Sequence, residues 1–202
     1  MTEISETFLE HTIKRRQRLS SLWYPDEIVY CAIGPKLNND FSEETKHDYS
    51  SHFSQALAIE SYRDGFMKAV DIIREELPKL KQPKDFEELY DWVCKLFNGK
   101  QNSLSDIKGI GLLSLYDISL AIGCNLYPKV LPCKYVYTHD NLSKAAEVLV
   151  GKPDNKNRIE AKLFSACLPH FSAMEIEDIL CVYGSKIIKE GKFEKKWLLS
   201  MP

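Results

Sequence analysis

The 202-residue sequence lacks the features that mark membrane, secreted and metal-dependent proteins. No apolar run approaches the ~18 residues that a membrane-spanning helix needs, and the N-terminus carries Glu3 and Glu6 where a signal peptide carries bases. The six cysteines include no C-x-x-C pair, so we expect buried free thiols and neither a zinc site nor a disulfide framework. These absences predict a cytoplasmic protein that contacts no membrane and that needs neither a metal nor a cofactor.

The sequence also has no large net charge of either sign. The formal net charge is −2, which argues against strong non-specific affinity for nucleic acid. The charge is unevenly distributed, however, because residues 100–145 carry five lysines against three aspartates. This part of the chain can therefore still make a weak contact with an anion.

Strand-like alternation is scarce. Only residues 135–138 form a β-like run, and most other apolar residues recur at helical spacing. The helices expected from this spacing cover residues 3–22, 42–77, 86–97, 112–122, 141–150, 157–168, 172–183 and 185–190. We therefore predict an all-α fold, a multi-helix orthogonal bundle with at most one short β-like segment. It forms either a single domain over residues 1–202 or two lobes, over 1–82 and 83–202.

Glycine makes up only nine residues, yet two of them, Gly109 and Gly111, flank the single apolar residue Ile110. Apolar residues then follow at helical spacing, so this stretch predicts a tight turn that opens a helix. Glycines allow positive φ and close approach of another backbone, and the first amides of a helix lack intrahelical partners. These amides can receive a phosphate, to which Lys108 would add a positive charge. We expect the Ile110 side chain to pack inward and hold the hairpin.

The core Lys108-Gly109-Ile110-Gly111, lying between two helical segments, resembles the helix-hairpin-helix (HhH) superfamily. The resemblance covers residues 103–123 and implies binding to the nucleic-acid backbone without reading of the base sequence. We therefore expect the hairpin to bind a DNA phosphate with the help of nearby lysines. The predicted nucleic-acid-binding residues are Lys108, Gly109, Ile110, Gly111, Lys100 and Lys134.

A wider resemblance, to the HhH DNA glycosylases similar to endonuclease III, concerns the catalytic positions. That family places a Lys, in its bifunctional members, two residues after the second hairpin glycine, and a catalytic Asp in a later Val-Asp-Thr-His segment. Here Leu113 stands at the first position, and Tyr137 stands at the second, within Val136-Tyr137-Thr138-His139. Neither Leu nor Tyr can stabilise an oxocarbenium-like centre or attack an anomeric carbon. The resemblance thus implies a glycosylase-like scaffold without the glycosylase residues.

Three functions stay open on these residues. The first is sequence-independent binding of the DNA backbone through the hairpin, without catalytic residues. The second is a helical structural or interaction protein that keeps the hairpin for packing. The third is a divergent DNA glycosylase or lyase with a relocated catalytic group, for which His139 and Asp140 are the weak candidates by residue type. The sequence favours the first narrowly over the second, and the third least.

Overall fold

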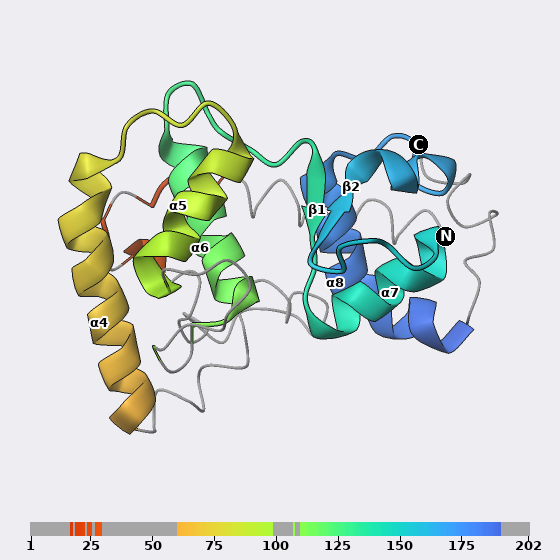
Figure 1. The fold of residues 1–202 in the computed structure, drawn as a ribbon, viewed down its shortest axis with the longest axis horizontal. Helices are drawn as coiled ribbons and strands as arrows, with labels where there is room; N and C mark the ends of the chain where they lie inside the picture. Colours follow the sequence, from red (N-terminus) through yellow and green to blue (C-terminus); the bar gives the residue numbers. More distant parts are fainter. Residues whose placement is uncertain are drawn as a thin grey trace. The chain divides into compact units, whose positions relative to one another are not determined.

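The computed structural model describes residues 17, 19–22, 24, 25, 27–29, 60–98, 107 and 110–190. Over these residues the chain is mostly helical, with five α-helices and two 3₁₀-helices of defined bounds and one two-stranded sheet (Figure 1). The predicted all-α class is confirmed. Most of the helix expected over residues 3–22, and the first half of that expected over 42–77, lie outside the described residues.

The described residues fall into two compact units. The first unit ends at Leu131, and the second begins at Pro132. The two-lobe expectation placed a boundary between residues 82 and 83, but the helices on either side of that point belong to the same unit and contact each other. By their contacts, the described residues around the expected boundary therefore belong to one unit, and the single-domain and two-lobe expectations stay predictions.

In the described part of the first unit, four helices have defined bounds. They are α4 (Glu60–Glu76), the 3₁₀-helix η2 (Leu77–Lys79), α5 (Phe86–Asn98) and α6 (Leu112–Asn125). In α4, Ala69, Val70 and Ile73 are buried on one face, as their helical spacing requires. Pro78 lies within η2, and its ring and missing N–H end the α-helix before it.

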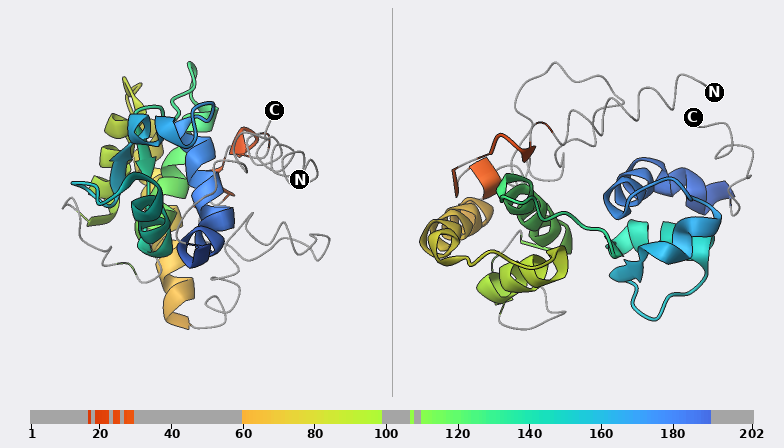
Figure 2. Two further views of the ribbon diagram at one scale, coloured as in Figure 1. Left: turned by 90° about the vertical axis from the view of Figure 1, so that its right-hand side faces the viewer. Right: turned by 90° about the horizontal axis from the view of Figure 1, so that it is seen from above.

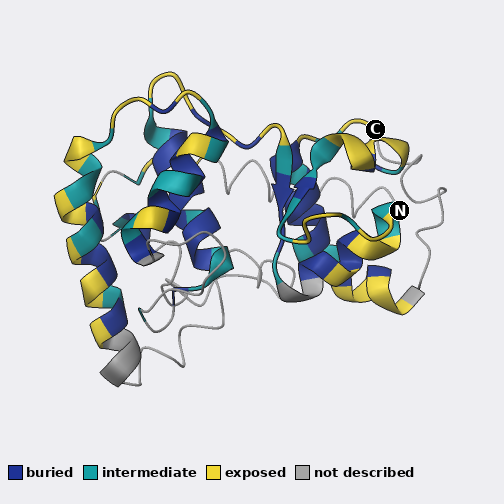
Figure 3. Ribbon diagram, viewed as in Figure 1, coloured by how far each residue is buried: buried dark blue, intermediate teal, exposed yellow. Residues whose placement is uncertain are grey.

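Helix α6 is the central element of this unit. It is buried along almost its whole length, and α5 packs directly against it (Figures 2 and 3). The Phe86 ring meets the Tyr116 ring edge to face, with the ring centroids 5.9 Å apart. In the described residues, the core of the first unit thus forms around α6.

The second unit packs two helices beside a small sheet. Its elements are β1 (Tyr135–Tyr137), α7 (Asp140–Val150), β2 (Arg158–Glu160), the 3₁₀-helix η3 (Ala161–Ala166) and α8 (Ala173–Glu190). The strands are antiparallel, with Val136 opposite Ile159, and both of these side chains are buried in one core with residues of α7 and α8. The β-like run at residues 135–138 is therefore a real strand.

Two details of this unit differ from the sequence expectation. The helix expected over residues 157–168 is wrong, because residues 158–160 pair with β1 and only the following six residues form a 3₁₀-helix. The helix break expected at Gly184 is also absent, and α8 runs through this residue. A Cβ placed at Gly184 would lie 3.4 Å from the Ala145 Cβ, so this glycine marks close packing of α8 on α7.

The five described cysteines are all free. Cys94 and Cys124 are buried as expected, whereas Cys133 is exposed. Cys167 is half-buried, and this burial raises the pKa of its thiol. No disulfide therefore constrains the described part of the fold.

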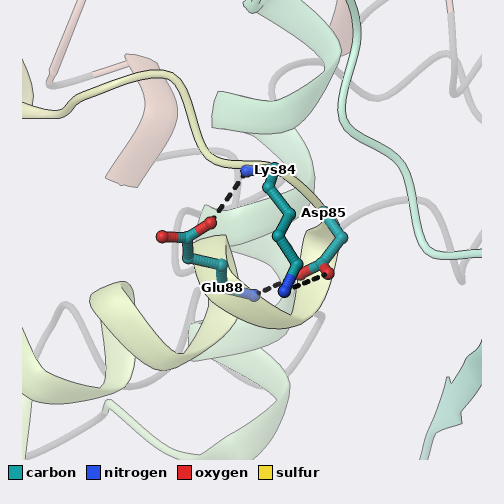
Figure 4. Close-up of polar contacts among 3 residues, drawn as sticks. All are labelled: Lys84, Asp85 and Glu88. Carbon is teal, nitrogen blue, oxygen red and sulfur yellow. Dashed lines mark hydrogen bonds and ion pairs between the residues drawn. The ribbon is translucent and has the colours of Figure 1, made fainter.

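The start of α5 is capped by two carboxylate side chains, Asp85 and Glu88. The Asp85 Oδ1 accepts a hydrogen bond from the Glu88 N–H at 2.9 Å, and the Glu88 Oε2 accepts one from the Lys84 N–H at 2.8 Å (Figure 4). This is a capping box in which the returning carboxylate satisfies the amide one position before the cap. It fixes where the linker ends and α5 begins.

Replacing Asp85 by alanine is expected to lower the free energy of unfolding by about 1 kcal/mol, because the Glu88 amide loses its partner. Urea titration followed by circular dichroism measures this change. The control is Lys84→Ala, which keeps the Lys84 N–H and removes only an exposed ion pair with an N to O distance of 3.7 Å, so its effect should be small. A loss as large in Lys84→Ala would contradict the capping assignment.

Candidate nucleic-acid interface

The predicted hairpin contains a closed turn immediately before α6. The Ile110 N–H donates to the Ile107 carbonyl at 3.0 Å. The Ile110 side chain is only 3% exposed, which confirms that it packs inward. Lys108 and Gly109 lie between these two residues and are outside the described part of the chain.

Gly111 is the N-cap of α6, and the arrangement around it is open. Its φ of −110° and ψ of −174° are extended values that any residue adopts, so the positive φ expected of the hairpin glycines does not occur here. A Cβ built at Gly111 would meet nothing within 4 Å. Neither backbone strain nor close packing therefore requires glycine at this position.

The first turn of α6 offers donors without competing charge. The Gly111 carbonyl accepts the first helical hydrogen bond from the Leu115 N–H at 3.0 Å, and Gly111, as the N-cap, has no side chain with which to cap the helix. The first turn contains no acidic residue, and Gly111, Leu112 and Leu113 are only half-buried. The positive end of the helix dipole therefore faces a region in which an anion meets no carboxylate of this turn.

Of the two further predicted binding lysines, the structure describes one. Lys100 is outside the described residues. Lys134 belongs to the second unit, whereas the hairpin belongs to the first. In the second unit the Lys134 ammonium lies 4.8 Å from the centroid of the Tyr135 ring, and the Lys134 carbonyl accepts a hydrogen bond from the Ala161 N–H at 2.9 Å. Lys134 thus contributes to the local structure at the start of β1.

The residues at the positions compared with the glycosylases belong to helices and a strand or directly flank them. Leu113 is half-buried in the first turn of α6. Tyr137 is 4% exposed in β1, with the Arg158 guanidinium 5.5 Å from its ring centroid. His139 is the N-cap of α7, where its carbonyl accepts the Leu142 N–H at 2.8 Å. Asp140 is the first residue of α7, and its side chain is not described.

Comparisons with known proteins add no assignment. No family model, no curated protein and no solved structure matches this chain. In the described ranges, no three His, Cys, Asp or Glu side chains gather closely enough to hold a metal ion. None of the helices in these ranges combines the length and apolar character needed to cross a bilayer. The candidate site therefore depends on the local chemistry of the hairpin.

Proposed function

We propose that this chain binds nucleic acid, DNA in the first place, by holding a backbone phosphate at the hairpin that opens α6. The observation that carries the proposal is the open N-terminus of α6, where Gly111 presents no side chain and the first turn has no carboxylate. Helix amides at such an end bind phosphate oxygens through hydrogen bonds and the helix dipole together. Lys108, next to the turn in sequence, supplies the positive charge.

Binding of this kind is independent of base sequence, because phosphates are the same at every step of the strand. It is also weak and sensitive to salt, since each neutralised phosphate changes the slope of log K against log salt by about 0.9. The formal net charge of −2 agrees with a small number of phosphate contacts. We therefore propose one or a few contacts and no extended electrostatic footprint.

The alternative proposal is a helical structural or interaction protein in which the hairpin serves packing. The burial of Ile110 favours it, because this side chain ties the turn to the core. The two proposals differ in what Lys108 does. A packing hairpin needs no charge at this position, whereas a phosphate site does.

Lys108→Ala is expected to weaken DNA binding about fivefold and to lower the salt slope by about one phosphate contact, with little change in melting temperature. Fluorescence anisotropy of a labelled duplex between about 50 and about 200 mM salt measures both quantities. The control is Lys68→Ala, because Lys68 is exposed on α4 of the same unit. An unchanged slope in Lys108→Ala, or no binding of any DNA or RNA at low salt, would leave only the packing proposal.

A further inference from the structure

The loop that follows α6 holds a tyrosine almost completely in solvent. We call residues 126–130 the Tyr127 loop. At its start the Leu126 N–H donates to the Ile122 carbonyl at 3.2 Å, and at its end the Val130 N–H donates to the Gly123 carbonyl at 3.0 Å. Val130 is 7% exposed, whereas Tyr127 is 97% exposed. Both ends of the loop are therefore fastened to the last turn of α6, and its tip presents an uncovered ring.

Two segments distant in sequence support this loop. The Gln82 side-chain amide donates to the Pro128 carbonyl at 3.3 Å, which brings the linker before α5 beside the loop at the top of the first unit in Figure 1. The Lys129 ammonium donates to the Ser20 hydroxyl at 3.0 Å. These contacts define the position of the loop from two sides, so that Tyr127 is presented by an anchored backbone.

The surroundings of Tyr127 are rich in lysine. The linker over residues 77–85 and the Tyr127 loop together hold four lysines and one carboxylate. The lysines are Lys79, Lys81, Lys84 and Lys129. Glu76 pairs with Lys79 at 2.7 Å and raises its pKa through that hydrogen bond, and the carboxylate of the linker, Asp85, lies 3.7 Å from the Lys84 ammonium.

The other two lysines are available to a ligand. In the part of the chain that the structure describes, Lys81 is exposed with no recorded ion pair, and Lys129 contacts a hydroxyl group, not a carboxylate. The other acids near the linker are Glu75, in the last turn of α4 and close enough to Lys79 to act on it, and Glu87 and Glu88 in the first turn of α5, where Glu88 is engaged in the capping box. Positive charge without a carboxylate partner therefore flanks the exposed ring.

We propose that Tyr127, with Lys81 and Lys129, forms a surface that binds single-stranded nucleic acid, with an unpaired base stacked on the ring and the neighbouring phosphates on the lysines. Proteins bind single strands through this combination of aromatic side chains and positive charge. The inference rests on the proposed function in taking nucleic acid as the ligand, and it adds that an unpaired segment is the preferred form. An exposed aromatic ring has no comparable use against an intact duplex, in which the bases are already stacked.

The two surfaces can be tested separately because they lie at opposite ends of α6. The hairpin precedes Leu112, and the Tyr127 loop follows Asn125. A substitution at one end therefore leaves the other end intact. Tyr127 also contributes no buried area, so its replacement should not change the melting temperature.

Tyr127→Ala in the full chain is expected to weaken binding of a short single-stranded oligonucleotide about tenfold. Tyr127→Phe should retain the affinity, because stacking needs the ring and not the hydroxyl. The probe carries one 2-aminopurine, whose fluorescence falls when the base stacks, and wild type and Tyr127→Phe should quench it while Tyr127→Ala should not. The control is Tyr24→Ala, since Tyr24 is the other highly exposed tyrosine among the residues that the structure describes, with 66% exposure.

The outcomes separate this inference from the proposed function. Duplex binding that depends on Lys108, together with single-strand binding that Tyr127→Ala does not change, overturns the inference and leaves the proposed function standing. An equal loss in Tyr24→Ala also overturns the assignment to Tyr127. Single-strand binding that needs Tyr127, together with duplex binding that Lys108→Ala does not change, supports the inference and overturns the hairpin proposal. No binding of either probe overturns both.

Discussion

Gly123→Ala is expected to lower the free energy of unfolding of the first unit by about 3 kcal/mol. A Cβ at this position would lie 2.1 Å from the Val130 carbonyl oxygen and 3.2 Å from the Leu89 Cδ2. The carbonyl oxygen is backbone and cannot move alone, because Val130 is buried and its N–H is bonded to Gly123. The gain of about 1 kcal/mol in helix propensity does not offset this overlap. Urea titration of the wild type and of Gly123→Ala measures the difference in the free energy of unfolding.

The matched control for this substitution is Gly184→Ala in α8. Both glycines lie inside helices, so both substitutions gain the same helix propensity. At Gly184 the new Cβ would be 3.4 Å from the Ala145 Cβ, which is ordinary van der Waals contact. We therefore expect Gly184→Ala to be neutral or stabilising by up to about 1 kcal/mol. A similar loss in both variants would mean that the contact with Val130 is not the cause.

Phe86→Ala is expected to cost about 4 kcal/mol of the free energy of unfolding, the larger of the two effects. Phe86 is 1% exposed at the start of α5, and its ring contacts Tyr116 of the central helix. The substitution removes a large apolar group and leaves a cavity between α5 and α6, which the rigid backbone can only partly fill. The change in the urea midpoint, at an unchanged slope, measures the loss.

Phe86→Leu is the control for the cavity. Leucine keeps most of the apolar volume and loses mainly the edge-to-face contact with Tyr116, so we expect a cost of about 1 kcal/mol. If leucine and alanine cost the same, the aromatic contact and not the cavity would dominate.

The features that the sequence predicts correctly are local ones. The apolar spacing identifies α5 and α6, and the side chains of Asp85 and Glu88 identify the start of α5. The same holds for α8, where the Ser172 N–H donates to the Glu175 Oε2 at 2.8 Å and the Glu175 N–H donates to the Ser172 Oγ at 3.3 Å. Each of these signals involves residues within one helical turn, so a single sequence contains them completely.

The features that the sequence does not predict depend on distant partners. Strand β2 has only three residues, and it exists because it pairs with β1, more than twenty positions earlier in the chain. One local signal does precede β2: the Asn155 Oδ1 accepts the N–H groups of Asn157 and Arg158, which makes a turn before the strand. That α8 continues through Gly184 is likewise not predicted, since the glycine there packs beside Ala145 of α7 and does not end the helix.

Some features of the candidate site also follow from adjacent residues, whereas others depend on distant parts of the chain. The inward packing of Ile110 and the start of α6 after Gly111 follow from adjacent residues, and both are found. That Lys134 belongs to the other unit does not follow from adjacent residues, because it depends on how the whole chain divides. The sequence does not predict the Tyr127 loop, because the loop is closed by a backbone hydrogen bond from the Val130 N–H to the Gly123 carbonyl, which no side-chain pattern marks. A glycine in the last turns of a helix, followed by Tyr127-Pro128, is the signal that could have indicated it.

The length of α6 has a consequence for any ligand that uses both of its ends. Its fourteen residues span about 21 Å, which equals the rise of about six base pairs of duplex DNA. Because α6 is buried and α5 packs against it, the distance between the two ends is fixed, and a ligand cannot shorten it. On the two proposals made above, an oligonucleotide below that length would reach only one end of α6, whereas a longer one would engage both ends and gain avidity.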